Sequence, residues 1–171
     1  LQLFGAEGDG SQRFRQEVRM AEWALAAGDA NSAQAHAWLA RGAASVRRDR
    51  MYALTLLVEA HRRDQSIDKL ILRFAGTAEL DAESRQTWID LLRETARVDE
   101  ALALFKQDAA FTPEMRRELL AICREAGRDE ELIATYDRMI EEEPQRLEWR
   151  VGLSRYWLEQ AAARVGAEVL E

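Results

Sequence analysis

Apolar and polar residues follow the period of an amphipathic helix along nearly the whole chain, from Ser11 onward. The pattern is clearest between Thr112 and Pro144, where Gly127 separates two apolar stripes. The first stripe comprises Leu119, Leu120, Cys123 and Ala126, and the second comprises Leu132, Ile133, Tyr136, Met139 and Ile140. Spacings of three and four residues place each stripe on one side of a helix. The segment is therefore predicted to form two helices that each bury one face.

Turn signals bound these two predicted helices. Thr112 is expected to cap the first helix, and Pro113 fits its first position, where the missing N–H costs nothing. Gly127 suits the left-handed residue that ends a helix. Asp129 is expected to cap the second helix and Pro144 to stop it.

The same arrangement recurs along the chain at intervals of about 31 to 37 residues. Asp68 and Asp99 each precede an apolar run, and Gly28 ends a helix that is followed by another at Asn31 or Ser32. Loops of about two to four residues between the helices force each helix to fold back on its neighbour. This period is typical of helical solenoids, in which each two-helix unit covers the apolar face of the next.

These residues resemble the tetratricopeptide repeat, a helix–turn–helix unit of about 34 residues. The resemblance implies an all-α fold, a right-handed α-solenoid of antiparallel helix pairs. Its repeats would span 14–50, 51–81, 82–112, 113–146 and an incomplete 147–171, after a frayed segment or the end of a preceding repeat at 1–13. The family's small-residue site falls on Ala21, Val58, Ile89, Leu120 and Ser154, of which only two are small. The array is therefore degenerate, and a HEAT-like stack remains an alternative.

The resemblance also predicts the core. In the second helix of each repeat, the family's alanine site falls on Ala33, Leu70, Ala101, Leu132 and Gly166, and its aromatic site on Ala37, Phe74, Phe105, Tyr136 and Leu170. Burying one Phe or Leu side chain stabilises a fold by about 1.5–3 kcal/mol. We therefore expect the large aromatic side chains to interlock between helices, namely Phe74, Phe105, Tyr136, Trp88 and Trp157.

Composition agrees with a folded, acidic protein. Of the 171 residues 47% are apolar and 32% charged, with a net charge of −7, so the chain gains no counterion-release attraction to nucleic acid. No apolar run is long enough to cross a membrane. The chain starts at Leu1 and stops inside an apparent repeat, so we expect a fragment of a longer solenoid.

Residues for catalysis or metal binding are sparse. His36 and His61 lie on different predicted hairpins without metal-ligand spacing, and Cys123 falls on a buried stripe. The glycines between Gly5 and Gly10 follow no strand and lack the lysine of a phosphate-binding loop. We therefore expect no catalytic, cofactor-binding or metal-binding residue, and a hydrogen-bonded structural role for His61.

Tetratricopeptide arrays usually hold a protein ligand in a concave groove lined by the first helix of each repeat. The matching positions form a mixed-charge track rich in arginine, which favours paired hydrogen bonds to carboxylates and so a polar or acidic partner. The alternative is an ordinary solvated face with pairs such as Glu59 and Arg63. The predicted partner-binding residues are Tyr52, Glu59, Arg62, Asp90, Arg93, Arg117, Arg124 and Arg155.

The resemblance therefore implies a non-enzymatic scaffold segment that docks partner proteins. The arginine-rich, irregular array is similar to the periplasmic scaffold portions of bacterial exopolysaccharide export proteins. This similarity favours a bacterial periplasmic location in a secretion complex, without membrane insertion of this segment. An accessory or regulatory domain of a cytoplasmic enzyme or adaptor remains the alternative.

Overall fold

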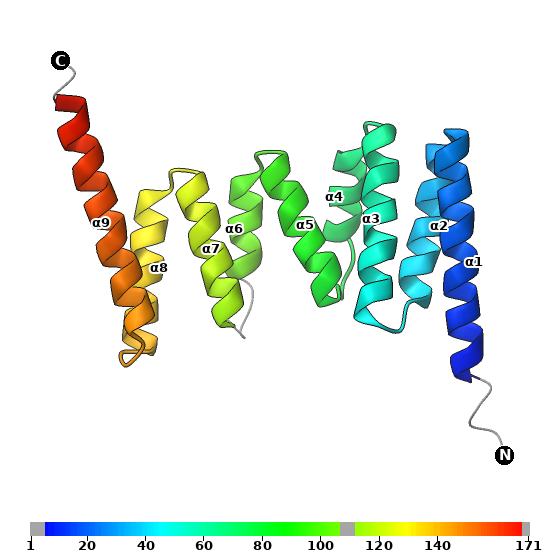
Figure 1. Ribbon diagram of the computed structural model, residues 1–171, viewed down its shortest axis with the longest axis horizontal. Helices are drawn as coiled ribbons and strands as arrows, with labels where there is room; N and C mark the ends of the chain where they lie inside the picture. The colour runs from blue at the N-terminus through cyan, green and yellow to red at the C-terminus, as the bar shows by residue number, and fades with distance from the viewer. Residues whose placement is uncertain (1–5, 107–111, 169–171) are drawn as a thin grey trace. The chain divides into compact units, whose positions relative to one another are not determined.

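The computed structural model describes residues 6–106 and 112–168, and every regular element within them is an α-helix (Figure 1). The predicted all-α class is therefore confirmed. The chain forms two compact units, which we describe separately as unit 1, residues 1–97, and unit 2, residues 98–171. Unit 1 contains α1 (Ala6–Ala27), α2 (Ala30–Ala43), α3 (Arg47–Arg63), α4 (Ile67–Ala75) and α5 (Ala82–Glu94). Unit 2 contains α6 (Val98–Lys106), α7 (Pro113–Glu125), α8 (Asp129–Glu142) and α9 (Leu147–Glu168).

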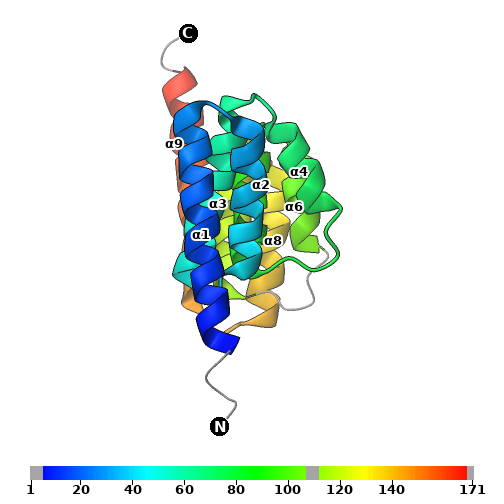
Figure 2. The same ribbon diagram turned by 90° about the vertical axis from the view of Figure 1, so that its right-hand side faces the viewer.

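Unit 1 has two layers of helices. Each helix from α1 to α5 packs on the next, and the odd-numbered helices also contact one another, α1 with α3 and α3 with α5. Figure 2 shows α2 and α4 together on one side of α1 and α3. This layering results from the short turns, because a helix that follows a short turn runs antiparallel to the helix before it.

Unit 2 is built by the same sequential packing. Helix α6 packs on α7, α7 on α8, and α8 on α9. The predicted boundaries of the clearest helix pair are confirmed at Thr112, whose side chain accepts a hydrogen bond from the Met115 N–H at 3.3 Å, and at Pro113 in the first turn. Helix α8 ends at Glu142, just before Pro144.

Four turns share one backbone conformation. The residue that links α1 to α2, α3 to α4, α5 to α6 and α7 to α8 is left-handed each time, with φ of 78° at Gly28, 52° at Gln65, 57° at Ala96 and 65° at Gly127. After α7, the Gly127 N–H donates to the Arg124 carbonyl and the Arg128 N–H to the Cys123 carbonyl. The other three turns repeat both hydrogen bonds at the same offsets. This is the Schellman motif, which satisfies carbonyl groups that the helix end would leave unpaired.

Buried core residues recur at fixed distances along the chain from each left-handed residue. Five residues after them lie Ala33, Leu70, Ala101 and Leu132, and nine residues after them lie Ala37, Phe74, Phe105 and Tyr136. All eight are buried, and they are the positions predicted for the alanine and aromatic sites. The predicted fifth members, Gly166 and Leu170, lie outside the side chains that the structure describes. The left-handed turn and its two buried positions therefore occur twice within unit 1 and once within unit 2, and the same spacing of buried residues follows Ala96 in α6.

The aspartates that were expected to mark helix starts lie within the first turn instead. Arg128 is the N-cap residue of α8, without a side-chain cap hydrogen bond, so the prediction that Asp129 caps this helix is wrong. Carboxylates in a first turn still interact favourably with the positive end of the helix dipole. In unit 1 the Asp68 carboxylate also accepts from Arg97 at 3.2 Å, and in unit 2 Asp99 pairs with Arg128 in the same way.

Two of the predicted core aromatics are not fully buried. Trp157 on α9 is 49% exposed, and Trp88 on α5 is half-buried. Helix α9 buries Trp149 and Tyr156 instead, and consecutive helical residues point about 100° apart, so Trp157 turns away from α8. The prediction for Trp157 was wrong because the sequence does not show which side of α9 packs against α8.

Candidate docking face

All eight predicted partner-binding residues lie on odd-numbered helices. Tyr52, Glu59 and Arg62 belong to α3, Asp90 and Arg93 to α5, Arg117 and Arg124 to α7, and Arg155 to α9. Glu59 and Arg93 are half-buried and the other six are exposed. We call the exposed side of these four helices the odd-helix face, and treat its two parts within unit 1 and unit 2 separately.

In unit 1 the odd-helix face carries a groove of about 250 Å³ between α3 and α5. Glu59 and Arg62 line one wall and Asp90 the other, so the structure brings three of the predicted residues together. Apolar side chains form much of the remaining lining, including Leu54, Val58 and Leu91. Tyr52 and Arg93 lie outside this lining.

Polar contacts bridge neighbouring odd-numbered helices in unit 1. The Arg62 guanidinium on α3 donates to Glu94 on α5 at 2.6 Å, and this hydrogen bond raises the pKa of Arg62. The Tyr52 hydroxyl donates to Glu22 on α1 at 2.5 Å, which raises the pKa of Tyr52. Arg62, which the sequence suggested only as a partner-binding residue, thus also links the two helices that form the groove.

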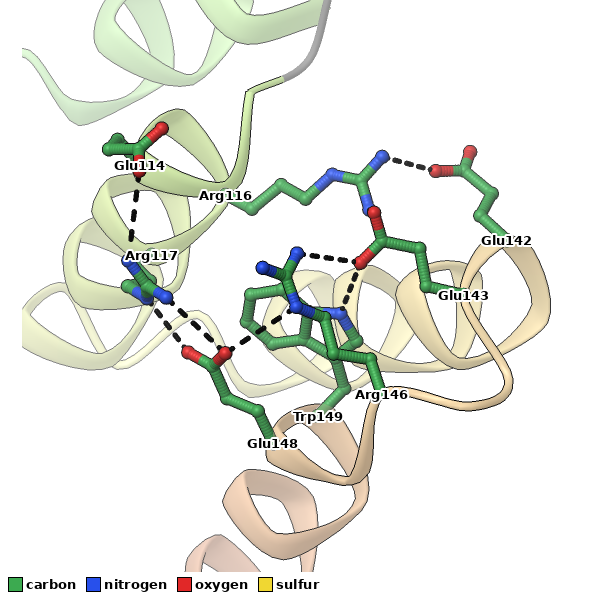
Figure 3. Close-up of polar contacts among 8 residues, drawn as sticks. All are labelled: Glu114, Arg116, Arg117, Glu142, Glu143, Arg146, Glu148 and Trp149. Atoms are coloured by element: carbon green, nitrogen blue, oxygen red, sulfur yellow. Dashed lines mark hydrogen bonds and ion pairs between the residues drawn. The ribbon is translucent and has the colours of Figure 1, made fainter.

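Unit 2 repeats this bridging (Figure 3). Arg117 on α7 donates twice to Glu148 on α9, at 2.8 and 3.3 Å, and the pKa of Glu148 is lowered mainly by these hydrogen bonds. Arg124 on α7 also lies 4.0 Å from Glu159 on α9, as an ion pair. Exposed pairs of this kind contribute little stability, so they orient the arginines more than they hold the fold.

A denser cluster joins the end of α8 to the start of α9 (Figure 3). Glu143 accepts from the indole N–H of the buried Trp149 and from Arg146, both at 3.0 Å. The pKa of Glu143 is lowered, with the Trp149 hydrogen bond as the largest cause. The Arg146 guanidinium lies 5.5 Å from the centre of the Trp149 ring. These contacts fix the α8–α9 turn and thereby the position of Glu148.

The sequence reasoning missed the carboxylate partners of the predicted arginines. Glu94, Glu148 and Glu159 lie about 31 to 35 residues after the arginines that they contact, which is about one repeat length. A search for opposite charges one repeat apart would have found them. The alternative of local pairs is also realised, because Arg63 donates to Glu59 at 2.8 Å within α3.

His61 and Cys123, two side chains with potential reactivity, are both buried in the helical core. His61 is buried, and its Nδ1 lies 2.9 Å from the Ser66 hydroxyl, as predicted for a hydrogen-bonded histidine. Burial is the main cause that lowers the pKa of His61. Cys123 is fully buried on α7. No group of three or more His, Cys, Asp or Glu in the described segments is arranged to hold a metal ion.

Within residues 6–106 and 112–168, none of the helices combines the length and apolar character needed to cross a membrane. In unit 1 the odd-helix face thus combines one groove, an ion pair between α3 and α5, and the exposed apolar side chains of Met51 and Tyr52. Comparison with known proteins finds no matching family model, no matching curated protein and no matching solved structure.

Proposed function

We propose that this chain is a non-enzymatic scaffold segment that docks a protein partner on its odd-helix face. The observation that carries the proposal is the groove between α3 and α5, where Glu59, Arg62 and Asp90 meet apolar side chains. An extended segment in such a groove gains affinity from its apolar side chains and specificity from the charges on the rim.

The groove in unit 1 favours a partner segment with basic and apolar side chains. Three carboxylates, from Glu59, Asp90 and Glu94, face the single guanidinium of Arg62. Arg62 already donates to Glu94. Glu59 and Asp90 pair with Arg63 and Arg93, which lie outside the lining, so the carboxylates outnumber the guanidinium groups only among the residues that line the groove itself. The sequence favoured a polar or acidic partner, a prediction that rested on the arginines and did not consider the carboxylates beside them.

We further propose that the helix pairs are tetratricopeptide-like repeats of a right-handed α-solenoid. The repeated left-handed turn and the shared buried positions nine residues after it support this proposal. For the kind of assembly, the proposal follows the sequence resemblance and names a bacterial exopolysaccharide secretion complex.

A matched pair of charge reversals tests the docking proposal. Asp90→Lys places a positive charge in the groove, whereas Glu79→Lys makes the same change at an exposed residue between α4 and α5. The variants are introduced into the intact protein, and the co-purified partner is quantified alongside the helical circular dichroism signal. Asp90→Lys is expected to lower capture at least about tenfold, since like charges at an interface cost several kcal/mol, while Glu79→Lys leaves it unchanged. Equal capture by both variants would contradict the proposal.

A further inference from the structure

Unit 2 contains a pocket of about 330 Å³ whose lining shares no residue with the groove in unit 1. The pocket lies between α6 and α8, and residues of α7 complete its lining. Its size falls at the lower end of the range of small-ligand sites, about 300–1,000 Å³. The apolar lining consists of Leu102, Phe105, Leu119, Cys123, Ala134 and Met139.

The polar group that distinguishes this pocket is Arg116, which is only 8% exposed. One nitrogen of its guanidinium, Nη2, donates to Glu142 at 2.8 Å. The Nη1 atom lies 3.2 Å from Glu143 without hydrogen-bond geometry, and Nε has no acceptor either. Buried donors without an acceptor are costly, so a ligand that supplies an oxygen there is favoured.

The charges of the lining favour a neutral ligand. Arg116 and Arg138 are balanced by Glu131 and Glu142, and Glu142 accepts from both arginines. An amide carbonyl oxygen therefore suits the unsatisfied donors better than an anion, which would compete with carboxylates already in place. The peptide backbone is the common source of such an oxygen in a protein partner.

In unit 1 a tryptophan side chain lies between the corresponding even-numbered helices, α2 and α4. Trp38 on α2 reaches α4, where its ring lies 6.1 Å from that of Phe74 and 3.7 Å from the Arg73 guanidinium. Trp38 is ten residues after the left-handed Gly28, and the residue ten after Ala96 is Lys106. Unit 1 thus places its own indole between two even-numbered helices, at a position where unit 2 has no aromatic residue.

A matching position on α3 and α7 also differs between the two units. Eleven residues before the left-handed residue of the turn, unit 1 has the buried Leu54 and unit 2 has Arg116. Leu54 offers no hydrogen-bond donor, and it also lines the groove between α3 and α5. The site in unit 2 instead combines open apolar space with hydrogen-bond donors that lack an acceptor.

We propose that the pocket between α6 and α8 takes an aromatic side chain of indole size from a partner protein, with Arg116 donating to a backbone carbonyl oxygen beside it. Aromatic anchors in well-packed pockets are typical energetic centres of protein interfaces. This site is separate from the groove in unit 1, and it stands whether or not the odd-helix face docks a partner.

The pocket is tested directly with N-acetyl-tryptophanamide, which carries an indole and two carbonyl groups. The 171-residue chain with ¹³C-labelled methionine methyl groups is titrated and followed by NMR. Met139 lines the pocket, whereas Met20 and Met51 lie in unit 1 and serve as internal controls. For a ligand of this size we expect a saturable shift at Met139 and none at Met20 or Met51, with a Kd of about 1 mM or tighter.

Two variants separate the parts of the proposal. Arg116→Leu copies the residue of unit 1 and should weaken N-acetyl-tryptophanamide about tenfold or more, to the affinity of 3-methylindole, which has no carbonyl group. Ala134→Trp fills the pocket from the exposed side of α8 and should abolish the shift. No shift at Met139, equal shifts at the control methionines, or binding unchanged in either variant would overturn the proposal.

Discussion

The turn between α7 and α8 offers a stability test that isolates the backbone. Gly127 is left-handed there with φ of 65°, and a Cβ atom added to it would meet nothing within 4 Å. The matching turn between α5 and α6 uses Ala96 with φ of 57° and an exposed side chain. Any effect of exchanging Gly and Ala at these positions must therefore come from conformational preference, since no packing is lost or gained.

The magnitude follows from two opposing terms. A left-handed conformation costs an L-residue roughly 1–2 kcal/mol, which glycine avoids. Replacing Gly by Ala also restricts the unfolded chain, which returns about 0.4–1 kcal/mol of stability. Gly127→Ala should therefore lower the free energy of unfolding by about 1 kcal/mol, and Ala96→Gly should raise it by about the same amount.

Urea denaturation followed by circular dichroism at 222 nm measures both variants against the parent chain. At this chain length a change of 1 kcal/mol corresponds to a shift in Tm of roughly 2–4 °C. Opposite signs of equal size are expected. If Ala96→Gly destabilises the protein or Gly127→Ala leaves it unchanged, the two turns do not share the conformation on which the repeat register depends.

Three further predictions concern the core and its protonation. Gly152→Ala should destabilise by about 1–3 kcal/mol, because the new Cβ would lie 2.7 Å from the Tyr136 hydroxyl oxygen, whereas Gly42→Ala meets nothing within 4 Å and should stabilise by up to about 1 kcal/mol in the same urea assay. Burial lowers the pKa of His61 below 6.5, so on acidification the unfolded chain binds this proton before the folded chain does. The free energy of unfolding should therefore decrease as the pH drops below about 6.5, and His61→Leu should reduce this decrease between pH 7.5 and 5.5. Phe105→Ala, which removes a side chain only 1% exposed, should cost about 3–5 kcal/mol, and an unchanged thermal melting curve would refute its place in the core.

Sequence pattern alone located the helix pairs because the strongest signals are local. Thr112 with Pro113 and the glycines at 28 and 127 each mark a boundary through their own backbone chemistry. Gln65 and Ala96 occupy the same left-handed position without such a signal, since the surrounding packing imposes a conformation that these residues do not favour by themselves. Their turns were predicted only through the spacing of the helices around them.

The site was predicted less completely because its contacts are long-range. The sequence placed Arg62 and Arg117 on exposed helix positions, yet it did not reveal Glu94 and Glu148 as their partners on the next odd-numbered helix. The sequence analysis did not single out Arg116, which is buried and lines the pocket of unit 2. Burial of a charged side chain depends on how neighbouring helices pack, and no local spacing reports it.

Site-specific photocrosslinking tests the docking face most directly. A benzoylphenylalanine residue replaces Thr55, an exposed residue that lines the groove between α3 and α5, or Leu72, which is 64% exposed on α4. The intact protein carrying either residue is irradiated in cells of its source, and adducts are identified by mass spectrometry. If a partner docks on the odd-helix face, one protein adduct is expected at Thr55 and none at Leu72. An adduct at Leu72 alone, or at neither position, would contradict docking on the odd-helix face.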